Sequence, residues 1–128
     1  RLGGEMFKLS EVSHIIAIGS DKMMNAVREA RHGVLAPHLN PKHLAIASIN
    51  SPMQCMMKEV CAQCLQRWVD PATGKEQFVF TCYNQDQPID NVDFRNLAAR
   101  LRANSAQEKL SLAWFERILA KQPDLRRV

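Results

Sequence analysis

All four cysteines of the chain lie close together in the sequence, and this cluster constrains the fold more than any other feature. Their spacing is C-x5-C-x2-C-x17-C, formed by Cys55, Cys61, Cys64 and Cys82. Cys61 and Cys64 can bind one metal centre from a single tight turn, and Cys55 lies one short loop before them. Cys82 can return to the same point across a β-hairpin. The spacing therefore predicts a site of four thiolates.

The composition and the absence of targeting signals indicate whether these cysteines bind a metal or form disulfides. The 128 residues are 46% hydrophobic, which is typical of a folded protein with one core or two small subdomains. No apolar run reaches membrane-spanning length, and the N-terminus lacks a signal-peptide pattern, so we expect a cytoplasmic protein with no membrane partner. Thiols stay reduced in the cytoplasm, so clustered cysteines favour metal binding over disulfides. The net charge of +4 is scattered, and no nucleic-acid partner is expected.

The first part of the chain has the pattern of an α/β sheet. The apolar run 14–18 predicts a buried strand, and Ser20 or Asp21 can cap the helix that follows. Apolar positions at helical spacing continue from Met23 to Val34 and Leu35, with an interruption at Gly33. The run 43–49 predicts a second strand. This order indicates part of a doubly wound parallel sheet over residues 1–50.

A small cysteine-rich module is predicted over residues 51–92. The segments 65–69 and 77–81 predict a hairpin whose turn signal is 70–74, and 84–91 is predicted to be a polar loop. Residues 93–128 are predicted to be a helical tail. One helix should run over 93–103, and a second should begin at the capping box formed by Ser105 and Glu108 and end at Pro123.

Two kinds of metal centre fit four thiolates. Zinc sites usually take their ligands as two close pairs, whereas here one loop supplies three cysteines and a distant strand end supplies the fourth. That asymmetry is closer to the C-x4-C-x2-C…C arrangement of 2Fe-2S proteins. A wide, negatively charged cluster needs a long loop that directs backbone N–H groups at its sulfurs. Met56, Met57 and Val60 are predicted to exclude water there. A structural zinc module that docks another protein remains the alternative.

Two segments together resemble a known family. These segments are Ile16-Ala-Ile-Gly-Ser-Asp-Lys-Met-Met24 and Pro52-Met-Gln-Cys55…Cys61-Ala-Gln-Cys64…Cys82-Tyr-Asn-Gln-Asp-Gln-Pro88. They resemble the C-terminal half of the electron-transfer subunit of dihydroorotate dehydrogenase, which belongs to the ferredoxin–NADP reductase-like flavoproteins. The resemblance covers roughly residues 13–92, with one residue more than usual between the first two cysteines. The family's FAD-binding barrel and first glycine-rich phosphate loop have no counterpart in this sequence.

The resemblance implies a role in electron transfer. Cys55, Cys61, Cys64 and Cys82 would bind a 2Fe-2S cluster, with zinc as the metal that an isolated chain can take instead. Gly19, Ser20, Asp21 and Met23 would border an NAD(P) site, and no catalytic residue is assigned. FAD and NAD(P) would be cofactors of the full-length oxidoreductase, whose upstream flavin and NAD(P) domains and a redox partner module would be the partners. The chain alone is not expected to oxidise NADH, because nothing in it offers a flavin site.

Overall fold

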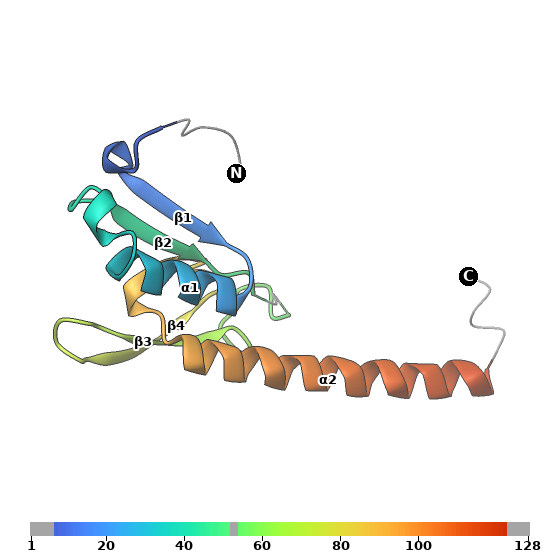
Figure 1. The fold of residues 1–128 in the computed structure, drawn as a ribbon. Coiled ribbons are helices and arrows are strands. Elements are labelled where there is room, and N and C mark those ends of the chain that lie inside the picture. Colours follow the sequence, from blue (N-terminus) through green and yellow to red (C-terminus); the bar gives the residue numbers. More distant parts are fainter. Residues whose placement is uncertain (1–6, 52–53, 123–128) are drawn as a thin grey trace. The chain divides into compact units, whose positions relative to one another are not determined.

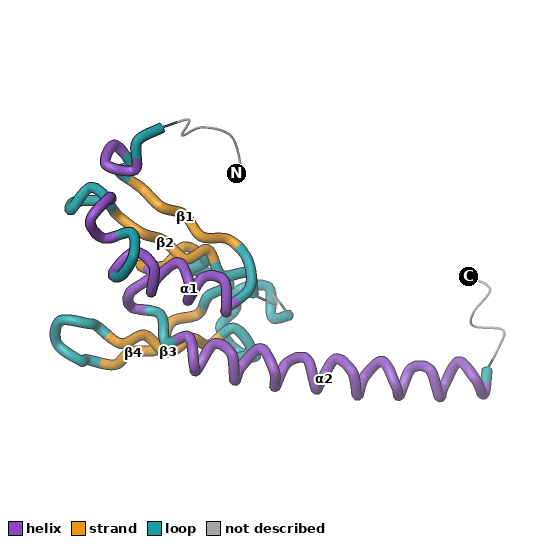
Figure 2. The backbone as a smooth tube through the Cα atoms, in the orientation of Figure 1, coloured by secondary structure: helices purple, strands orange, loops and turns teal. Residues whose placement is uncertain are grey.

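The computed structural model describes residues 7–51 and 54–122. It has mixed α/β content, with two small sheets and a C-terminal helix, and this confirms the predicted class at that level. The main elements are β1 (His14–Ile18), α1 (Asp21–His32), β2 (Leu44–Ser48), β3 (Leu65–Val69), β4 (Glu76–Phe80), β5 (Asp86–Pro88) and α2 (Phe94–Lys121). Three short 3-10 turns, η1 (Leu9–Glu11), η2 (Ala36–His38) and η3 (Ile89–Asn91), complete them (Figures 1 and 2). The chain divides into two compact units, 1–97 and 98–128.

The segment β1–α1–β2 forms a parallel strand pair joined by a helix, as the sequence predicts. Ile16 lies opposite Ile46 in the register of the two strands. Ala17 and Ala47 share the buried face of this pair, and α1 lies along the sheet in Figure 1. The prediction that this strand is buried is wrong, because Ala17 is its only buried residue and Ile16 and Ile18 on the opposite face are exposed. Ser20 caps α1, because its Oγ accepts the amide N–H of Met23 at 3.2 Å.

The predicted continuation of this helix through Val34 and Leu35 is wrong. α1 ends at His32, and the N–H of Gly33 donates to the carbonyls of Glu29 and Ala30. The glycine ends the helix because it has high conformational freedom and no side chain to pack. Val34 is consequently exposed rather than part of an apolar helical stripe.

The predicted polar loop 84–91 is also wrong, because it contains a strand. β5 pairs antiparallel with β2, and Ser48 lies opposite Asp86. The sheet order is therefore β1-β2-β5. The polar Gln87 can be fully buried in this strand because its side-chain amide accepts the indole N–H of Trp68 and donates to the Asn84 carbonyl. The sequence analysis missed this strand because it looked for runs of apolar residues, and the buried residue here is a glutamine.

The second sheet is the predicted hairpin. β3 and β4 pair antiparallel, with Leu65 opposite Phe80. In the turn, the Asp70 carboxylate accepts the amide N–H of Ala72 at 2.9 Å and the hydroxyl of Thr73 at 2.8 Å. Gly74 has a φ of +69°, a left-handed conformation that favours glycine. Local turn chemistry therefore determines the hairpin, which explains why the sequence predicts it well.

The predicted break between two C-terminal helices does not exist. α2 runs without interruption from Phe94 to Lys121, and no Gly or Pro lies between these two residues. Asp93 supplies the cap, since its Oδ1 accepts the amide N–H groups of Arg95 and Asn96, both at 3.0 Å. Ser105 lies inside the helix, so the predicted capping box is not used. Pro123, the predicted end, is outside the described residues. No helix in the described part of the chain is long and apolar enough to span a membrane.

Candidate metal centre

The hairpin brings two of the four cysteines together. Cys64 immediately precedes β3, and Cys82 lies just beyond β4. Thr81 fixes this end of the hairpin, because its amide N–H and its hydroxyl both donate to the Cys64 carbonyl, at 3.1 and 2.9 Å. The two Sγ atoms are 3.2 Å apart, and the residues are only 1% and 8% exposed. The hairpin therefore returns Cys82 beside Cys64, as the turn signal predicts.

The other two cysteines form a second pair in the preceding loop. Cys55 and Cys61 are both partly exposed, and their thiols hydrogen-bond each other. Backbone N–H groups in this loop also donate to Cys55. The amide of Cys61 has the largest effect, followed by that of Val60, and together with smaller contributions they lower the pKa of the Cys55 thiol to about 6. The loop thus stabilises a thiolate at its first cysteine.

The backbone of this loop has an unusual conformation that accounts for its N–H donors. Met56, Met57, Glu59 and Ala62 have φ values of 52°, 62°, 58° and 55°. Left-handed conformations are unfavourable for residues with a β-carbon, by roughly 1–2 kcal/mol each. Backbone that alternates between left- and right-handed residues forms concave N–H sites for anions. Strained backbone of this kind clusters at functional sites, which makes the loop a candidate for one.

This strain gives a testable expectation. Replacing Glu59 with glycine should raise the free energy of unfolding by up to about 1 kcal/mol, because glycine adopts φ > 0 without steric conflict. Urea denaturation measures the change. The matched control is Lys58→Gly in the same loop, where φ is not positive. That substitution should give no gain, and equal effects of the two changes would contradict the assigned backbone.

The four thiols influence one another electrostatically. The pKa of Cys82 is raised to about 11, first by its hydrogen bond with Cys64 and then by burial, with smaller contributions from the charges of Cys64, Cys55 and Cys61. Within residues 7–51 and 54–122, however, no three Cys, His, Asp or Glu side chains are gathered around one point that could hold a single metal ion. The sulfurs are arranged as two pairs, one at the hairpin and one in the loop.

The surroundings of the loop differ from the prediction. Met56, Met57 and Val60 do not exclude water, because they are 72%, 49% and 77% exposed. The loop contributes backbone N–H groups to Cys55, whereas the side chains of these three residues remain in solvent. Pro52 and Met53, which belong to the family-like motif, lie outside the described residues.

The predicted NAD(P)-facing residues lie together where β1 meets α1. The side chain of Met23 covers Gly19, since a β-carbon on Gly19 would lie 2.3 Å from Cε of Met23. Ser20 caps the helix, and Asp21 is its first residue, an acidic group in the first turn. These four residues occupy the carboxyl end of a parallel strand, where nucleotides bind in doubly wound sheets. Their role in binding remains a prediction.

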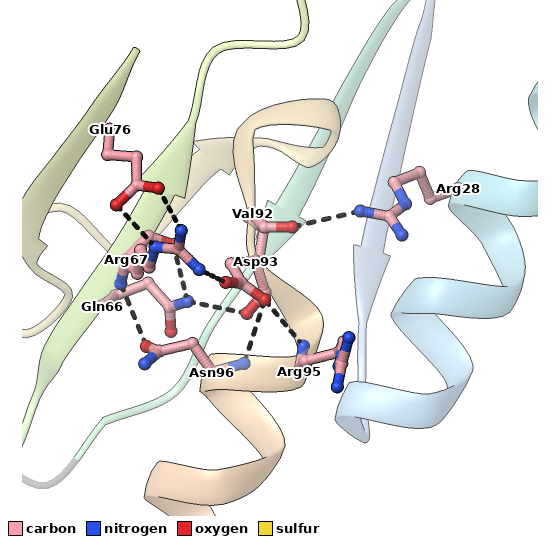
Figure 3. A network of polar contacts seen from close by, with 8 residues as sticks. All are labelled: Arg28, Gln66, Arg67, Glu76, Val92, Asp93, Arg95 and Asn96. Carbon is pink, nitrogen blue, oxygen red and sulfur yellow. Dashed lines mark hydrogen bonds and ion pairs between the residues drawn. The ribbon is translucent and has the colours of Figure 1, made fainter. Parts of the chain in front are cut away.

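A polar network that the sequence does not reveal supports the hairpin (Figure 3). The guanidinium of Arg67 on β3 pairs with Glu76 on β4 and, at 2.7 Å, with Asp93. The amide N–H of Arg67 donates to Asn96, and the Gln66 side chain donates to the carbonyls of Arg67 and Asp93. The network fixes β3 to the start of α2 and so holds the hairpin end that bears Cys64. Of these residues only Asp93 can be recognised from the sequence, because an aspartate just before a helix is a common N-cap.

Comparison with known proteins gives one informative relative. No protein-family model matches the chain. An uncharacterized protein of Rickettsia prowazekii (strain Madrid E) is 47% identical over 66 residues, which is 52% of this chain. The match spans 9% of that relative's length, so the relative is a much longer protein. The shared segment therefore also occurs within a long polypeptide.

Proposed function

We propose that this chain is the electron-transfer domain of a larger FAD- and NAD(P)-dependent oxidoreductase, with a 2Fe-2S cluster held by Cys55, Cys61, Cys64 and Cys82. The observation that supports this most is the loop around Cys55, whose backbone N–H groups point at a cysteine sulfur. Hydrogen bonds of this kind to cysteine sulfurs tune iron–sulfur centres.

The donor set fits a two-iron cluster. Each iron of such a cluster takes two protein thiolates, and the sulfurs form two pairs in the structure. When bound, the cluster supplies one-electron transfer. The chain's residues would hold it: the hairpin positions Cys64 and Cys82, and the loop positions Cys55 and Cys61. The amides of Val60 and Cys61, which donate to Cys55, would offset the negative charge of the bound group.

The assignment to a larger oxidoreductase is supported by the first sheet. β1–α1–β2 is a parallel unit of the kind that builds doubly wound nucleotide-binding domains, and Gly19, Ser20, Asp21 and Met23 lie at its carboxyl end. Upstream flavin and NAD(P) domains would reduce the cluster, and a redox partner module would receive its electrons. The length of the Rickettsia relative is consistent with such an arrangement.

A structural zinc module is the second candidate, favoured by the close pair of Cys64 and Cys82. In a tetrahedral zinc site with bonds of about 2.3 Å, sulfurs lie roughly 3.8 Å apart. The observed 3.2 Å needs only a small adjustment to reach that separation. In this candidate the exposed Met56 and Val60 would contact a docked protein.

Anaerobic reconstitution with iron and sulfide, with zinc in a parallel sample, separates the two candidates. We expect a coloured protein with visible charge-transfer absorption and equal amounts of iron and sulfide. Chemical reduction should bleach it, while NADH without added flavin should not. A protein that stays colourless and retains only zinc would contradict the electron-transfer proposal. Because thiolates accept either metal, the sample must first be freed of metal.

A further inference from the structure

The four thiols differ in how easily a reagent in solution reaches them. Cys64 and Cys82, the inner pair, are 1% and 8% exposed. Cys55 and Cys61, the outer pair, are both partly exposed. Thiol–disulfide exchange requires direct contact between the attacking sulfur and the disulfide that it attacks, so access determines which thiols react. A small disulfide in solution therefore meets the outer pair first.

Each thiol of the outer pair already has the other as its neighbour. The thiols of Cys55 and Cys61 hydrogen-bond each other. In the part of the chain that the structure describes, no three Cys, His, Asp or Glu side chains gather around one point. The C-x2-C spacing of Cys61 and Cys64 suggests a different partner, but Ala62, with a φ of 55°, turns the backbone between them. A bond within the outer pair requires no exchange of neighbours, whereas a bond between Cys61 and Cys64 would break both pairs.

We propose that Cys55 and Cys61 form a reversible disulfide in the metal-free chain, with a low-molecular-weight disulfide such as oxidised glutathione as the oxidant, and that this bond blocks metal loading. One outer thiol loses its proton and attacks a sulfur of the oxidant, which forms a mixed disulfide and releases one small thiolate. The other outer thiol loses its proton, attacks the protein sulfur of that mixed disulfide and releases the second small thiolate. The protein loses two electrons and two protons, and the oxidant becomes two thiols.

The block on metal loading follows from the number of ligands. This part of the inference rests on the proposed function, in which all four cysteines form one metal centre. With the outer pair oxidised, only the inner thiols can become thiolates. A structural zinc ion and a 2Fe-2S cluster each take four protein ligands, so two are too few for either. The outer pair would therefore admit metal only after it has been reduced.

Oxidation of the metal-free chain in glutathione buffers, followed by alkylation and tryptic mapping, tests the disulfide. Trypsin cleaves after Lys58, between the outer cysteines, and produces peptides 43–58 and 59–67, while Cys82 lies in 76–95. We expect 43–58 and 59–67 to be joined, with both inner cysteines alkylated. The outer pair should oxidise about 10-fold or more faster than the inner pair, whose thiols react only when the site opens locally. A first bond that joins 59–67 to 76–95, a bond within 59–67, or no bond at all would overturn the proposal.

Single substitutions provide a second readout. Cys55→Ser and Cys61→Ser each leave one outer thiol without its partner, so the reaction should stop at the mixed disulfide and one glutathione should stay attached to the chain. An internal disulfide in either variant would contradict the assigned pairing. The matched control is Met56→Ser, which introduces a hydroxyl at a residue that is 72% exposed in the same loop. This variant should form the disulfide at the rate of the parent chain.

Zinc binding measures the block on metal loading, because zinc itself takes no part in redox chemistry. The oxidised chain should bind zinc at least about 100-fold more weakly than the reduced chain, and a phosphine reductant should restore the affinity. Equal affinities would overturn the block. Because the mapping uses no metal, the two proposals fail separately. A colourless zinc protein with the outer disulfide would refute only the electron-transfer proposal, and a red-brown protein without it would refute only this inference.

Discussion

Replacing Cys82 with serine should remove most of the iron from the reconstituted chain, even though Cys82 is distant in sequence from the other three cysteines. Changes to groups that merely orient metal ligands reduce metal affinity by about 10–100-fold, so loss of a ligand should cost at least that much. Cys82 is 3.2 Å from Cys64 and 8% exposed, so water cannot easily replace its sulfur. Iron and sulfide analysis after desalting measures the loss, and visible absorption should fall in parallel.

The control for this experiment is Val60→Ser, which also introduces a hydroxyl near the site. Val60 is exposed, and it contributes its backbone amide rather than its side chain, so iron content should be unchanged. Cys55→Ser, Cys61→Ser and Cys64→Ser should each reproduce the loss seen for Cys82. Normal iron content in the Cys82 variant would exclude Cys82 from the site and leave Cys55, Cys61 and Cys64 without a fourth cysteine ligand.

Removal of the Asp93 side chain should destabilise the fold by about 2–3 kcal/mol, because it deletes a helix cap and a charged hydrogen-bond partner together. Its carboxylate accepts two amide N–H groups of the first turn of α2 and pairs with Arg67 at 2.7 Å. The side chain is 14% exposed, so water compensates for little of this loss. Chemical denaturation of Asp93→Ala measures the change. Asp86→Ala, at an exposed position on β5, should stay within about 0.5 kcal/mol of the parent chain.

The same carboxylate should make stability depend on acid. Burial by itself raises the pKa of Asp93, but the amide N–H of Asn96 and the Arg67 guanidinium outweigh it, so the pKa lies below its usual value. A carboxyl with a lowered pKa stabilises the folded state fully above its unfolded value, about 4, and loses this contribution as pH falls through the folded value. Asp93→Asn keeps the cap acceptor but cannot titrate. Its stability should therefore fall less than that of the parent chain below pH of about 4.

Local signals in the sequence were sufficient for part of this structure. The extended backbone at 14–18, a cap at Ser20 or Asp21 and the 70–74 turn each depend on residues that are close in sequence, and each of these was predicted. The structure selects Ser20 as the cap, and it shows that the predicted burial of the strand was wrong for Ile16 and Ile18. β5 was missed because it contains a buried glutamine. The side-chain amide of Gln87 is satisfied by the indole N–H of Trp68, which lies on another strand, and this contact cannot be read from the local sequence. The uninterrupted α2 was missed because Ser105 and Glu108 form a capping pattern that a good helix-forming sequence overrides.

The candidate site was likewise predicted only where the signal is local in the sequence. The spacing of the cysteines predicted that Cys64 and Cys82 meet, since only a hairpin separates them. It did not predict the left-handed loop after Cys55, because Met56, Met57 and Glu59 are residue types that rarely adopt this conformation. Nor could it place the side chains of this loop, which depend on which way the backbone turns. Side-chain patterns contain little information about a site built from backbone N–H groups.

The pairing of β5 with β2 has a consequence for how the cysteine segment relates to the sheet. The N–H of Ile49 donates to the carbonyl of Gln85 at 3.0 Å, so the chain leaves β2 and returns to β5 at adjacent positions. The segment between these two strands also contains Trp68, whose indole N–H donates to the buried Gln87 of β5. A short turn in place of this segment would leave the side-chain amide of Gln87 without that partner. The first sheet and the cysteine-bearing hairpin should therefore fold in one cooperative step, before any metal is loaded.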